Sequence, residues 1–261
     1  MSNQIYIISD VHGCYDTLMA LIAKLPSDAR LVFVGDLIDR GLDSKKVVDF
    51  VHKNNYEIVT GNHEHMVVDC YKTNGFADST CCTSKYGRMW IENGGVECLI
   101  SYNKNIDAED AKWMSTLPSY LLFEDYKDEK GRSLVVTHAA ALDYLSIYFK
   151  ILDRYDDLDD ISVVDEDMMD YVENHMIWNR TAPMIPQKNY FNVFGHTPIS
   201  NFIRHNMAYL NSENIVVNLD VGYANIDTGA AYKKNKPFPS GILTALEFPS
   251  MRVIQQTNIE A

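Results

Sequence analysis

The chain has 261 residues, of which 46% are hydrophobic and 23% are charged, so it has enough apolar material for the core of a large globular domain. Its formal net charge of −13 and its pI near 4.9 argue against binding to nucleic acid or to an anionic membrane through a global positive field. No apolar run in the sequence reaches the roughly 20 residues that span a bilayer.

The first part of the chain alternates predicted strands with predicted helices. Apolar runs predict strands over residues 4–8, 31–35 and 56–60. Apolar residues at helical spacing, together with capping residues, predict helices over 15–25, over 44–51 with Ser44 as the N-cap, and from Glu64 to Tyr71. This alternation is typical of a sheet with right-handed crossovers and helices on its faces.

The rest of the chain contains strands that follow one another. Residues 73–88 lack a clear period and are predicted to form a surface excursion, and 107–117 a short helix. Strands are predicted over 120–124 and 133–137 as a hairpin, and then over 190–194, 215–218, 225–229, 241–246 and 251–256. We therefore predict an α/β (α+β) fold with two sheets packed face to face and helices outside. Without repeats or Gly/Ser-rich linkers, one domain is expected over 1–261.

The cysteines indicate a reducing environment. There are five of them, an odd number without the spacing of a secreted disulfide framework. The first residues also lack the basic segment and apolar core of a signal peptide, so we expect a cytoplasmic protein. Cys81 and Cys82 are adjacent but have no CxxC partner, and we interpret them as ordinary thiols rather than a redox or metal pair.

Residues of the types that bind divalent metals follow five of the predicted strands. They are Asp10 with His12, Asp36, Asn62, His138 and His196. Because ligands usually lie beyond the carboxyl ends of strands in helix-covered sheets, we expect these side chains to converge. Oxygen and nitrogen ligands without cysteine suit Mn, Fe, Zn or Mg rather than a structural, cysteine-rich zinc site.

Each residue has an ordinary structural alternative when it is taken alone. Asp36 is compatible with an Asx turn that caps the next helix, with Asp39 and Arg40 as a surface ion pair. His138 is compatible with a buried strand-end histidine, and Arg180 with a salt-bridge partner for the acidic run over 153–170. The recurrence of such residues at successive strand ends favours the metal site.

These motifs resemble those of the metallophosphoesterases. Gly35-Asp36-Leu37-Ile38-Asp39-Arg40-Gly41 and Gly61-Asn62-His63-Glu64 resemble the serine/threonine phosphoprotein phosphatase branch. Asn93-Gly94-Gly95 and Ile177-Trp178-Asn179-Arg180 resemble the small bacterial and bacteriophage lambda type of protein phosphatase, whose relatives include symmetrical diadenosine tetraphosphatases. The resemblance extends from Asp10 to Leu246 and implies a calcineurin-like β-sandwich of two mixed sheets flanked by helices.

The resemblance also implies a centre of two divalent ions, with Mn²⁺ as the first candidate and Fe, Zn or Mg as alternatives. The expected ligands are Asp10 and His12 for one ion, Asn62, His138 and His196 for the other, and Asp36 as the bridge. Two such ions orient phosphoryl oxygens and lower the pKa of a water between them. A carboxylate suits the bridging position because it offers two oxygens and a negative charge.

Catalytic roles for His63 and Asp39 follow from the same resemblance. His63 is expected to protonate the leaving alkoxide, while Asp39 fixes its tautomer and favours the imidazolium. Arg40, Asn62 and Arg180 are expected to bind substrate. A planar guanidinium matches phosphate geometry and neutralises developing charge, so the site forms a locally positive region in an acidic protein.

We therefore predict a metal-dependent phosphomonoester hydrolase, in the first place a serine/threonine or dual-specificity protein phosphatase acting on phosphoproteins, phosphopeptides or small phosphoesters. The alternative is a symmetrical dinucleoside polyphosphate hydrolase acting on diadenosine tetraphosphate. A noncatalytic metal-binding protein is a third hypothesis, which the presence of His63, Asp39 and Arg40 disfavours. No nucleic-acid or membrane partner is expected.

Two charged segments receive no functional assignment from the sequence. The acidic run over 153–170 is interpreted as a solvated helix or loop face. Residues 233–240 form a basic, proline-containing insertion relative to related chains. We interpret this insertion as a solvated turn rather than a rim of the site that binds acidic substrate segments.

Overall fold

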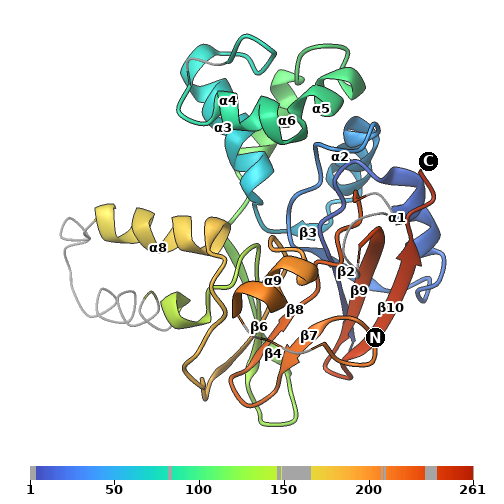
Figure 1. Cartoon of the computed structure of the whole chain (residues 1–261), viewed down its shortest axis with the longest axis vertical. Helices are drawn as coiled ribbons and strands as arrows, with labels where there is room; N and C mark the ends of the chain where they lie inside the picture. The colour runs from blue at the N-terminus through green and yellow to red at the C-terminus, as the bar shows by residue number, and fades with distance from the viewer. Residues whose placement is uncertain are drawn as a thin grey trace.

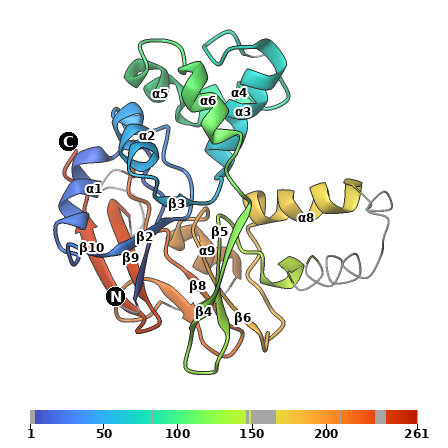
Figure 2. The same cartoon turned by 180° about the vertical axis from the view of Figure 1, so that it is seen from behind.

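The computed structural model describes residues 4–81, 84–145, 148, 166–206, 208, 210–232 and 240–260. Two β-sheets lie face to face with helices outside them, and a group of helices between residues 62 and 114 forms a lobe at one end of the molecule (Figure 1). The view from behind shows a helix over residues 166–178 extending from the second sheet (Figure 2).

The first sheet has the strand order β10-β9-β1-β2-β3. Its parallel part consists of β1 (Ile5–Ile8), β2 (Arg30–Phe33) and β3 (Glu57–Ile58). The antiparallel part consists of β9 (Ile242–Phe248), which pairs with β1, and β10 (Arg252–Thr257) at the edge. The two ends of the chain therefore meet in one sheet.

The second sheet has the order β4-β5-β6-β8-β7. It begins with the hairpin of β4 (Tyr120–Lys127) and β5 (Ser133–Thr137). Strands β6 (Tyr190–Phe194) and β8 (Tyr223–Asn225) continue it in parallel with β5, and β7 (Val216–Asn218) closes the far edge in antiparallel pairing. The carboxyl ends of β5, β6 and β8 therefore lie at the same edge of this sheet.

Helices cover the outer faces of both sheets. On the first sheet these are α1 (Tyr15–Ile22), α2 (Ser44–Lys53) and the start of α3 (Asn62–Asn74). The lobe continues with α4 (Gly87–Trp90), a π-helical turn (Ile91–Gly95), α5 (Val96–Ser101) and α6 (Ala108–Met114). On the second sheet α8 (Glu166–Trp178) packs on the outer face. Helix α9 (Ile199–Asn206) follows β6, and its buried residues Ile199 and Phe202 join the cluster between the sheets.

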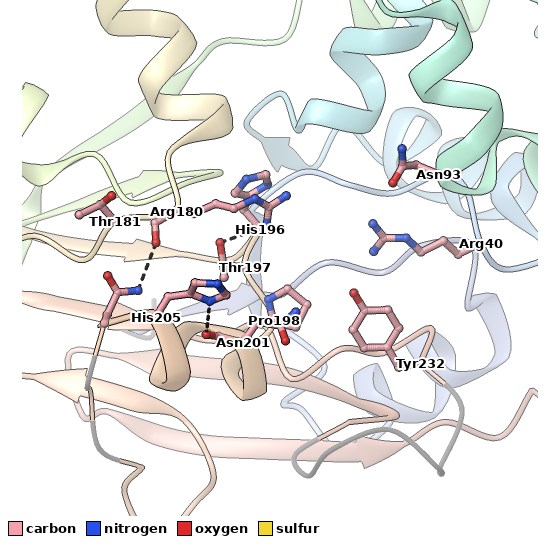
Figure 3. Close-up of a pocket in the computed structure, with 11 residues that line it drawn as sticks. Arg40, Asn93, Arg180, Thr181, His196, Thr197, Pro198, Asn201, His205 and Tyr232 are labelled. Atoms are coloured by element: carbon pink, nitrogen blue, oxygen red, sulfur yellow. Dashed lines mark hydrogen bonds between the residues drawn. The ribbon is translucent and has the colours of Figure 1, made fainter.

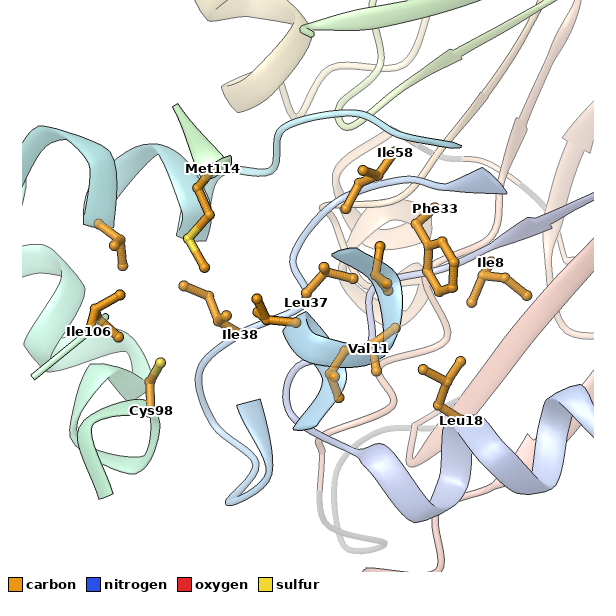
Figure 4. Packing of buried hydrophobic residues seen from close by; sticks show 14 of the residues in the cluster. Ile8, Val11, Leu18, Phe33, Leu37, Ile38, Ile58, Cys98, Ile106 and Met114 are labelled. Atoms are coloured by element: carbon orange, nitrogen blue, oxygen red, sulfur yellow. The ribbon is translucent and has the colours of Figure 1, made fainter. Parts of the chain in front are cut away.

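The alternation of side chains along each strand divides the core into layers. Ile5 and Ile7 point toward the second sheet and join Val136, Phe191 and related residues in one buried cluster between the sheets. Their neighbours Tyr6 and Ile8 point the other way. They join a cluster with the helices that continues through Phe33, Leu37 and Ile38 into the lobe (Figure 4).

The predicted two-sheet sandwich with flanking helices is confirmed, but three local predictions are wrong. Residues 226–229 are not a strand, because β8 ends at Asn225 and the chain turns there. Ser44 is the first residue of α2 rather than its N-cap, which is Asp43; the Ser44 hydroxyl accepts a hydrogen bond from the Asp39 N–H instead (3.0 Å). The excursion over 73–88 is partly core, since Ala77 and Cys81 are fully buried.

Several predicted features fall outside the described residues. These are Cys82, most of the acidic run (153–165), and most of the basic insertion (233–239). None of the described helices has the length and apolar composition that crossing a membrane requires.

The contact between the sheets can be tested at Phe191. Its ring is fully buried on β6, and its centroid lies 5.8 Å from that of Phe248 on β9 of the other sheet. We expect Phe191→Ala to lower the free energy of unfolding by about 3–5 kcal/mol, because it removes apolar contacts and leaves a cavity. Urea denaturation measures this change. Leu219→Ala, at a half-exposed position, is the control and should change stability by less than about 0.5 kcal/mol.

Candidate metal centre

All six residues predicted as metal ligands lie buried at the facing edges of the two sheets. They come from the ends of β1, β2, β5 and β6 and from the start of α3. Asp36 lies between two histidines and turns a different carboxylate oxygen to each. Its Oδ2 is 3.5 Å from Nε2 of His12, and its Oδ1 is 3.4 Å from Nε2 of His138. This is the arrangement that a bridging carboxylate requires.

A second cluster forms around His138. Its Nε2 lies 3.0 Å from Oδ1 of Asn62 and 3.1 Å from Nδ1 of His196, and the latter two atoms are 2.8 Å apart. Asp36, His138 and His196 place three potential ligand atoms within 4.8 Å of one another. Asn62 adds an amide oxygen to this group.

The hydrogen bonds of two histidines fix which ring nitrogen carries the proton. Nδ1 of His12 donates to the carbonyl of Ile38, and Nδ1 of His138 donates to the carbonyl of Val34, both at 2.8 Å. Each ring therefore turns an unprotonated Nε2 toward the site. On the His138 side this lone pair faces the Asn62 and Asp36 oxygens, which are also acceptors. A cation fits such a group of facing acceptors.

His196 supplies a further sign of fit. Its Nε2 is buried and has no hydrogen-bond partner among the described residues. A buried ring nitrogen without a partner is costly in a purely structural site, and Nδ1 of the same ring faces the Asn62 and His138 atoms of the ligand group. The residues present therefore suit divalent ions.

The charge states of these side chains suit the same role. Burial lowers the pKa of His12, His138 and His196, so the rings are neutral and available as ligands. Burial alone would raise the pKa of Asp36, but its electrostatic interactions with the surrounding histidine rings and with the Arg40 guanidinium outweigh this effect and hold the pKa well below its usual value. Asp36 is thus an ionised carboxylate among neutral imidazoles.

Asp10 lies at the same edge and contacts the segment that carries His196. Both of its carboxylate oxygens accept the backbone N–H of His196, at 3.0 and 3.2 Å. The second compact group of ligand atoms that the described residues form consists of His12, Asp36 and His63. His63 was predicted as a proton donor. Its Nε2 lies 3.8 Å from Oδ2 of Asp36, compared with 3.5 Å for Nε2 of His12.

A chain of hydrogen bonds holds His63 in place. Its Nδ1 is bonded to Oδ2 of Asp39, and the other oxygen of Asp39 accepts the indole N–H of Trp90 at 2.9 Å. All three residues are buried. Asp39 and His63 are therefore not a surface feature, and Trp90, which no sequence motif singled out, fixes the orientation of the pair.

Glu64 is a second contributor that sequence reasoning did not assign. Its carboxylate is fully buried and accepts three backbone N–H groups, those of Asp36, Leu37 and Gly61, at 2.8, 2.8 and 3.0 Å. It therefore fastens the turn that carries Asp36 to the turn that begins α3. The signal was present in the motif Gly61-Asn62-His63-Glu64, but only the fold shows which backbone groups the carboxylate reaches.

Tight turns bring the side chains this close together. His12, Asp36, Asp39, Arg40 and His196 all have positive φ, which non-glycine residues seldom adopt outside functional turns. Two glycines permit the close approach of backbones. A Cβ on Gly61 would overlap Oδ1 of Asp36, and Gly94, at φ +110°, accepts the N–H of Arg40 through its carbonyl at 3.1 Å.

A pocket of about 610 Å³ opens beside the ligands. Arg40 and Tyr232 line one side, and Arg180 and His196 the other, so two guanidinium groups face the same space (Figure 3). Arg40 donates to Nε2 of both His12 and His63, the latter at 3.0 Å. Arg180 donates to the hydroxyl of Thr197 at 3.3 Å. The outer wall is formed by Thr181, Asn201, His205 and Asn206.

This combination of a two-sheet sandwich with two ligand groups sharing one aspartate defines a metal-dependent phosphoesterase. The family model of the calcineurin-like phosphoesterases matches residues 4–224, and the chain belongs to this family. Members of the family use a dinuclear metal centre, and they are hydrolases of phosphoesters.

Known proteins resemble the chain to different extents. It is 29% identical over 273 residues to an asymmetrical bis(5'-nucleosyl)-tetraphosphatase, PrpE, of Halalkalibacterium halodurans, covering 96% of this chain and 92% of that protein. It is 32% identical over 94 residues to serine/threonine-protein phosphatase 2 of Salmonella typhimurium, covering only 35% of this chain and 38% of that protein. A metallophosphoesterase from Sphaerobacter thermophilus has a similar fold, with a TM-score of 0.51, 16% identity, and coverage of 97% and 87% of the two chains.

Glu64 provides a test of how the site is supported. Glu64→Gln keeps the size of the side chain but replaces one acceptor oxygen with an NH₂ group, which cannot accept from a backbone N–H. We expect a loss of roughly 3 kcal/mol in the free energy of unfolding, measured by urea denaturation in a chelator so that metal binding does not contribute. Glu129→Gln, in the exposed β4–β5 turn, is the control. A change below 1 kcal/mol in Glu64→Gln would show that these three bonds do not support the fold.

Proposed function

We propose that the protein hydrolyses dinucleoside polyphosphates and that the pocket beside the ligand groups binds the substrate. The observation that carries this proposal is the pocket. Its volume of about 610 Å³ lies within the roughly 300–1,000 Å³ of cavities that enclose drug-sized ligands, and it is large for a phosphoryl group alone. The likeness to a bis(5'-nucleosyl)-tetraphosphatase over nearly the whole of both chains supports the same substrate class.

The residues of the site are proposed to divide the chemistry among them. Asp10, His12, Asp36, Asn62, His138 and His196 would hold the two ions. When bound, the ions supply an activated water and contacts that polarise the phosphoryl oxygens. Arg40 and Arg180 face one another across the pocket and would bind an anionic chain of phosphates between them. His63, oriented by Asp39, would give its proton to the leaving oxygen.

Hydrolysis of phosphoproteins is the second candidate. It is favoured by the local likeness to serine/threonine-protein phosphatase 2, although that likeness covers 35% of the chain. The motifs around Asp36 and Asn62 also support it. Under either function we propose Mn²⁺ as the first candidate ion and a cytoplasmic location. The third hypothesis is a metal-binding protein without turnover. It would be supported if the metal-loaded protein hydrolysed none of the phosphoesters tested.

The products of diadenosine tetraphosphate distinguish these functions. With added Mn²⁺ we expect ATP and AMP, the products of asymmetrical cleavage, separated and quantified by ion-exchange chromatography. We expect kcat/KM to exceed that for a phosphoserine peptide by at least tenfold. ADP as the only product would indicate symmetrical cleavage instead. A preference for the phosphopeptide would replace the proposal with the protein phosphatase.

His63→Asn tests the proposed proton transfer. A phosphate leaving group is a much weaker base than a serine alkoxide and needs the proton less. We therefore expect kcat to fall by roughly 10²–10⁴ on a phosphoserine peptide, and by less on diadenosine tetraphosphate. Metal content, measured by elemental analysis, should stay near two ions per chain.

The matched control for this experiment is His52→Asn, because the His52 ring stacks on Trp113 outside the pocket, with centroids 4.6 Å apart. This variant should retain wild-type turnover on both substrates. Unchanged turnover of a metal-loaded His63→Asn protein would remove His63 from the mechanism.

A further inference from the structure

The pocket beside the ligand groups is lined by two kinds of side chain. Arg40 and Arg180 carry positive charge, whereas the outer wall offers amide, hydroxyl and imidazole groups. Among the described residues that form this wall, none is a lysine, arginine, aspartate or glutamate. Thr181 and His205 lie on the side of Arg180, away from Arg40 (Figure 3). This side of the pocket therefore suits an uncharged group that forms hydrogen bonds, rather than a further phosphate.

Helix α9 turns one of its faces toward this wall. Asn201 and His205 stand at positions i and i+4 of the helix, so they lie on the same face, and both line the pocket. Ile199 and Phe202 are buried in the cluster between the sheets. Because the helix cannot rotate without exposing these two side chains to water, its polar face is held toward the pocket.

Asn206 ties the end of α9 to the segment that carries Arg180. Its side-chain Nδ2 donates to the backbone carbonyl of Arg180 at 3.1 Å, and its Oδ1 accepts the N–H of Ala182 at 2.8 Å. The polar face of α9 and the backbone of Arg180 therefore keep a fixed relation to each other. A group bound on this face and a phosphate bound by the Arg180 guanidinium can belong to one molecule.

Two side chains on this face are free to contact a ligand. Nδ1 of His205 donates to the backbone carbonyl of Asn201 at 2.8 Å, which orients the ring. Within the part of the chain that the structure describes, the side-chain amide of Asn201 makes no hydrogen bond. A flat ring can stack on a nucleobase. A carboxamide places a donor beside an acceptor, which is the pattern that pairs with the amino group and a ring nitrogen of adenine.

We propose that the outer wall is a nucleobase subsite, in which the His205 ring stacks on the base and the Asn201 amide pairs with its edge. This inference rests on the proposed function, because it places one nucleoside of the dinucleoside polyphosphate in the pocket. The phosphates then run from the base past Arg180 toward Arg40 and the ligand groups. The ligand class is an adenosine polyphosphate, and inorganic polyphosphate leaves the wall unused.

The competing interpretation is that Asn201 and His205 belong to an ordinary solvated helix face. The pocket would then bind only the phosphates, and a nucleoside triphosphate would bind no better than inorganic tripolyphosphate. ATP and tripolyphosphate share the same chain of three phosphates, and only ATP carries a base. The preference for ATP over tripolyphosphate therefore separates the two interpretations.

The experiment measures the binding of ATP and of tripolyphosphate by isothermal titration calorimetry to metal-stripped protein in chelator. We expect the wild type to bind ATP at least about tenfold more tightly, because stacking and pairing of the base add to the phosphate contacts. The double variant Asn201→Ala with His205→Ala should bind the two ligands with affinities within about threefold of each other. Alanine favours the helix at both positions, so the variant should fold, which circular dichroism checks.

Two further variants serve as controls. His205→Phe keeps a flat ring and should retain a preference for ATP of at least about fivefold. Asn189→Ala removes an exposed amide just before β6, at the opposite end of the strand from His196, and should bind both ligands as the wild type does. A wild type that binds ATP no better than tripolyphosphate, or not at all, would overturn the proposal. So would a double variant that retains the wild-type preference.

The test is independent of the proposed reaction, because binding in chelator requires neither metal nor turnover. If the double variant loses the preference but the wild type does not hydrolyse diadenosine tetraphosphate, the nucleobase subsite stands and the proposed reaction fails. If diadenosine tetraphosphate is hydrolysed but the preference does not depend on Asn201 and His205, the reaction stands and the subsite fails.

Discussion

The architecture depends on bringing buried lone pairs together at one edge of two sheets. Oδ1 of Asn62 and Oδ1 of Asp36 lie 3.0 and 3.4 Å from Nε2 of His138, and all three atoms are acceptors. Such a group is unfavourable in a dry interior unless a cation lies among its members. The packing of the sheets must therefore supply the free energy that holds these strand ends together before any ion binds.

That free energy comes from layers that have little to do with the site itself. The cluster between the sheets contains Ile5, Ile7 and Val34 from one sheet and Val136 and Val193 from the other. Each lies within a few residues of a predicted ligand. Close packing here leaves the strand ends little freedom to separate, so a ligand set from distant parts of the chain behaves as one preformed group.

From the sequence, the order of the strands in the sheets could be predicted only in part. The meeting of the candidate ligand residues at one edge could be predicted. Runs of Ile, Val and Phe that stop abruptly at Asp, Asn or His are visible without a structure, and they placed Asp36, His138 and His196 at strand ends. What the sequence could not provide was contacts between distant residues. Trp90 and Glu64 look ordinary in the chain, yet one donates to Asp39 and the other fastens the Asp36 turn.

The error at 225–229 has a related cause. Its residues, Asn-Ile-Asp-Thr-Gly, have the β-branched content of a short strand, so local propensity favoured continuing β8. Tertiary structure ends the strand at Asn225, whose amide bonds to the Thr197 carbonyl and turns the chain inward. The consequence is that Asp227 lies in the turn beyond β8 rather than in a strand.

The arginines resolve the remaining conflict between an acidic protein and an anionic substrate. With a net charge of −13 the field of the protein repels phosphates, and at physiological ionic strength screening confines that repulsion to distances within about 8 Å. Inside the pocket, local charge decides. Arg40 is held by the Gly94 carbonyl and the two histidines, whereas the Arg180 guanidinium donates to the Thr197 hydroxyl at 3.3 Å. Under the proposed function, Arg40 would be the preorganised part of the phosphate site, and Arg180 would be the part that adjusts to the length of the substrate.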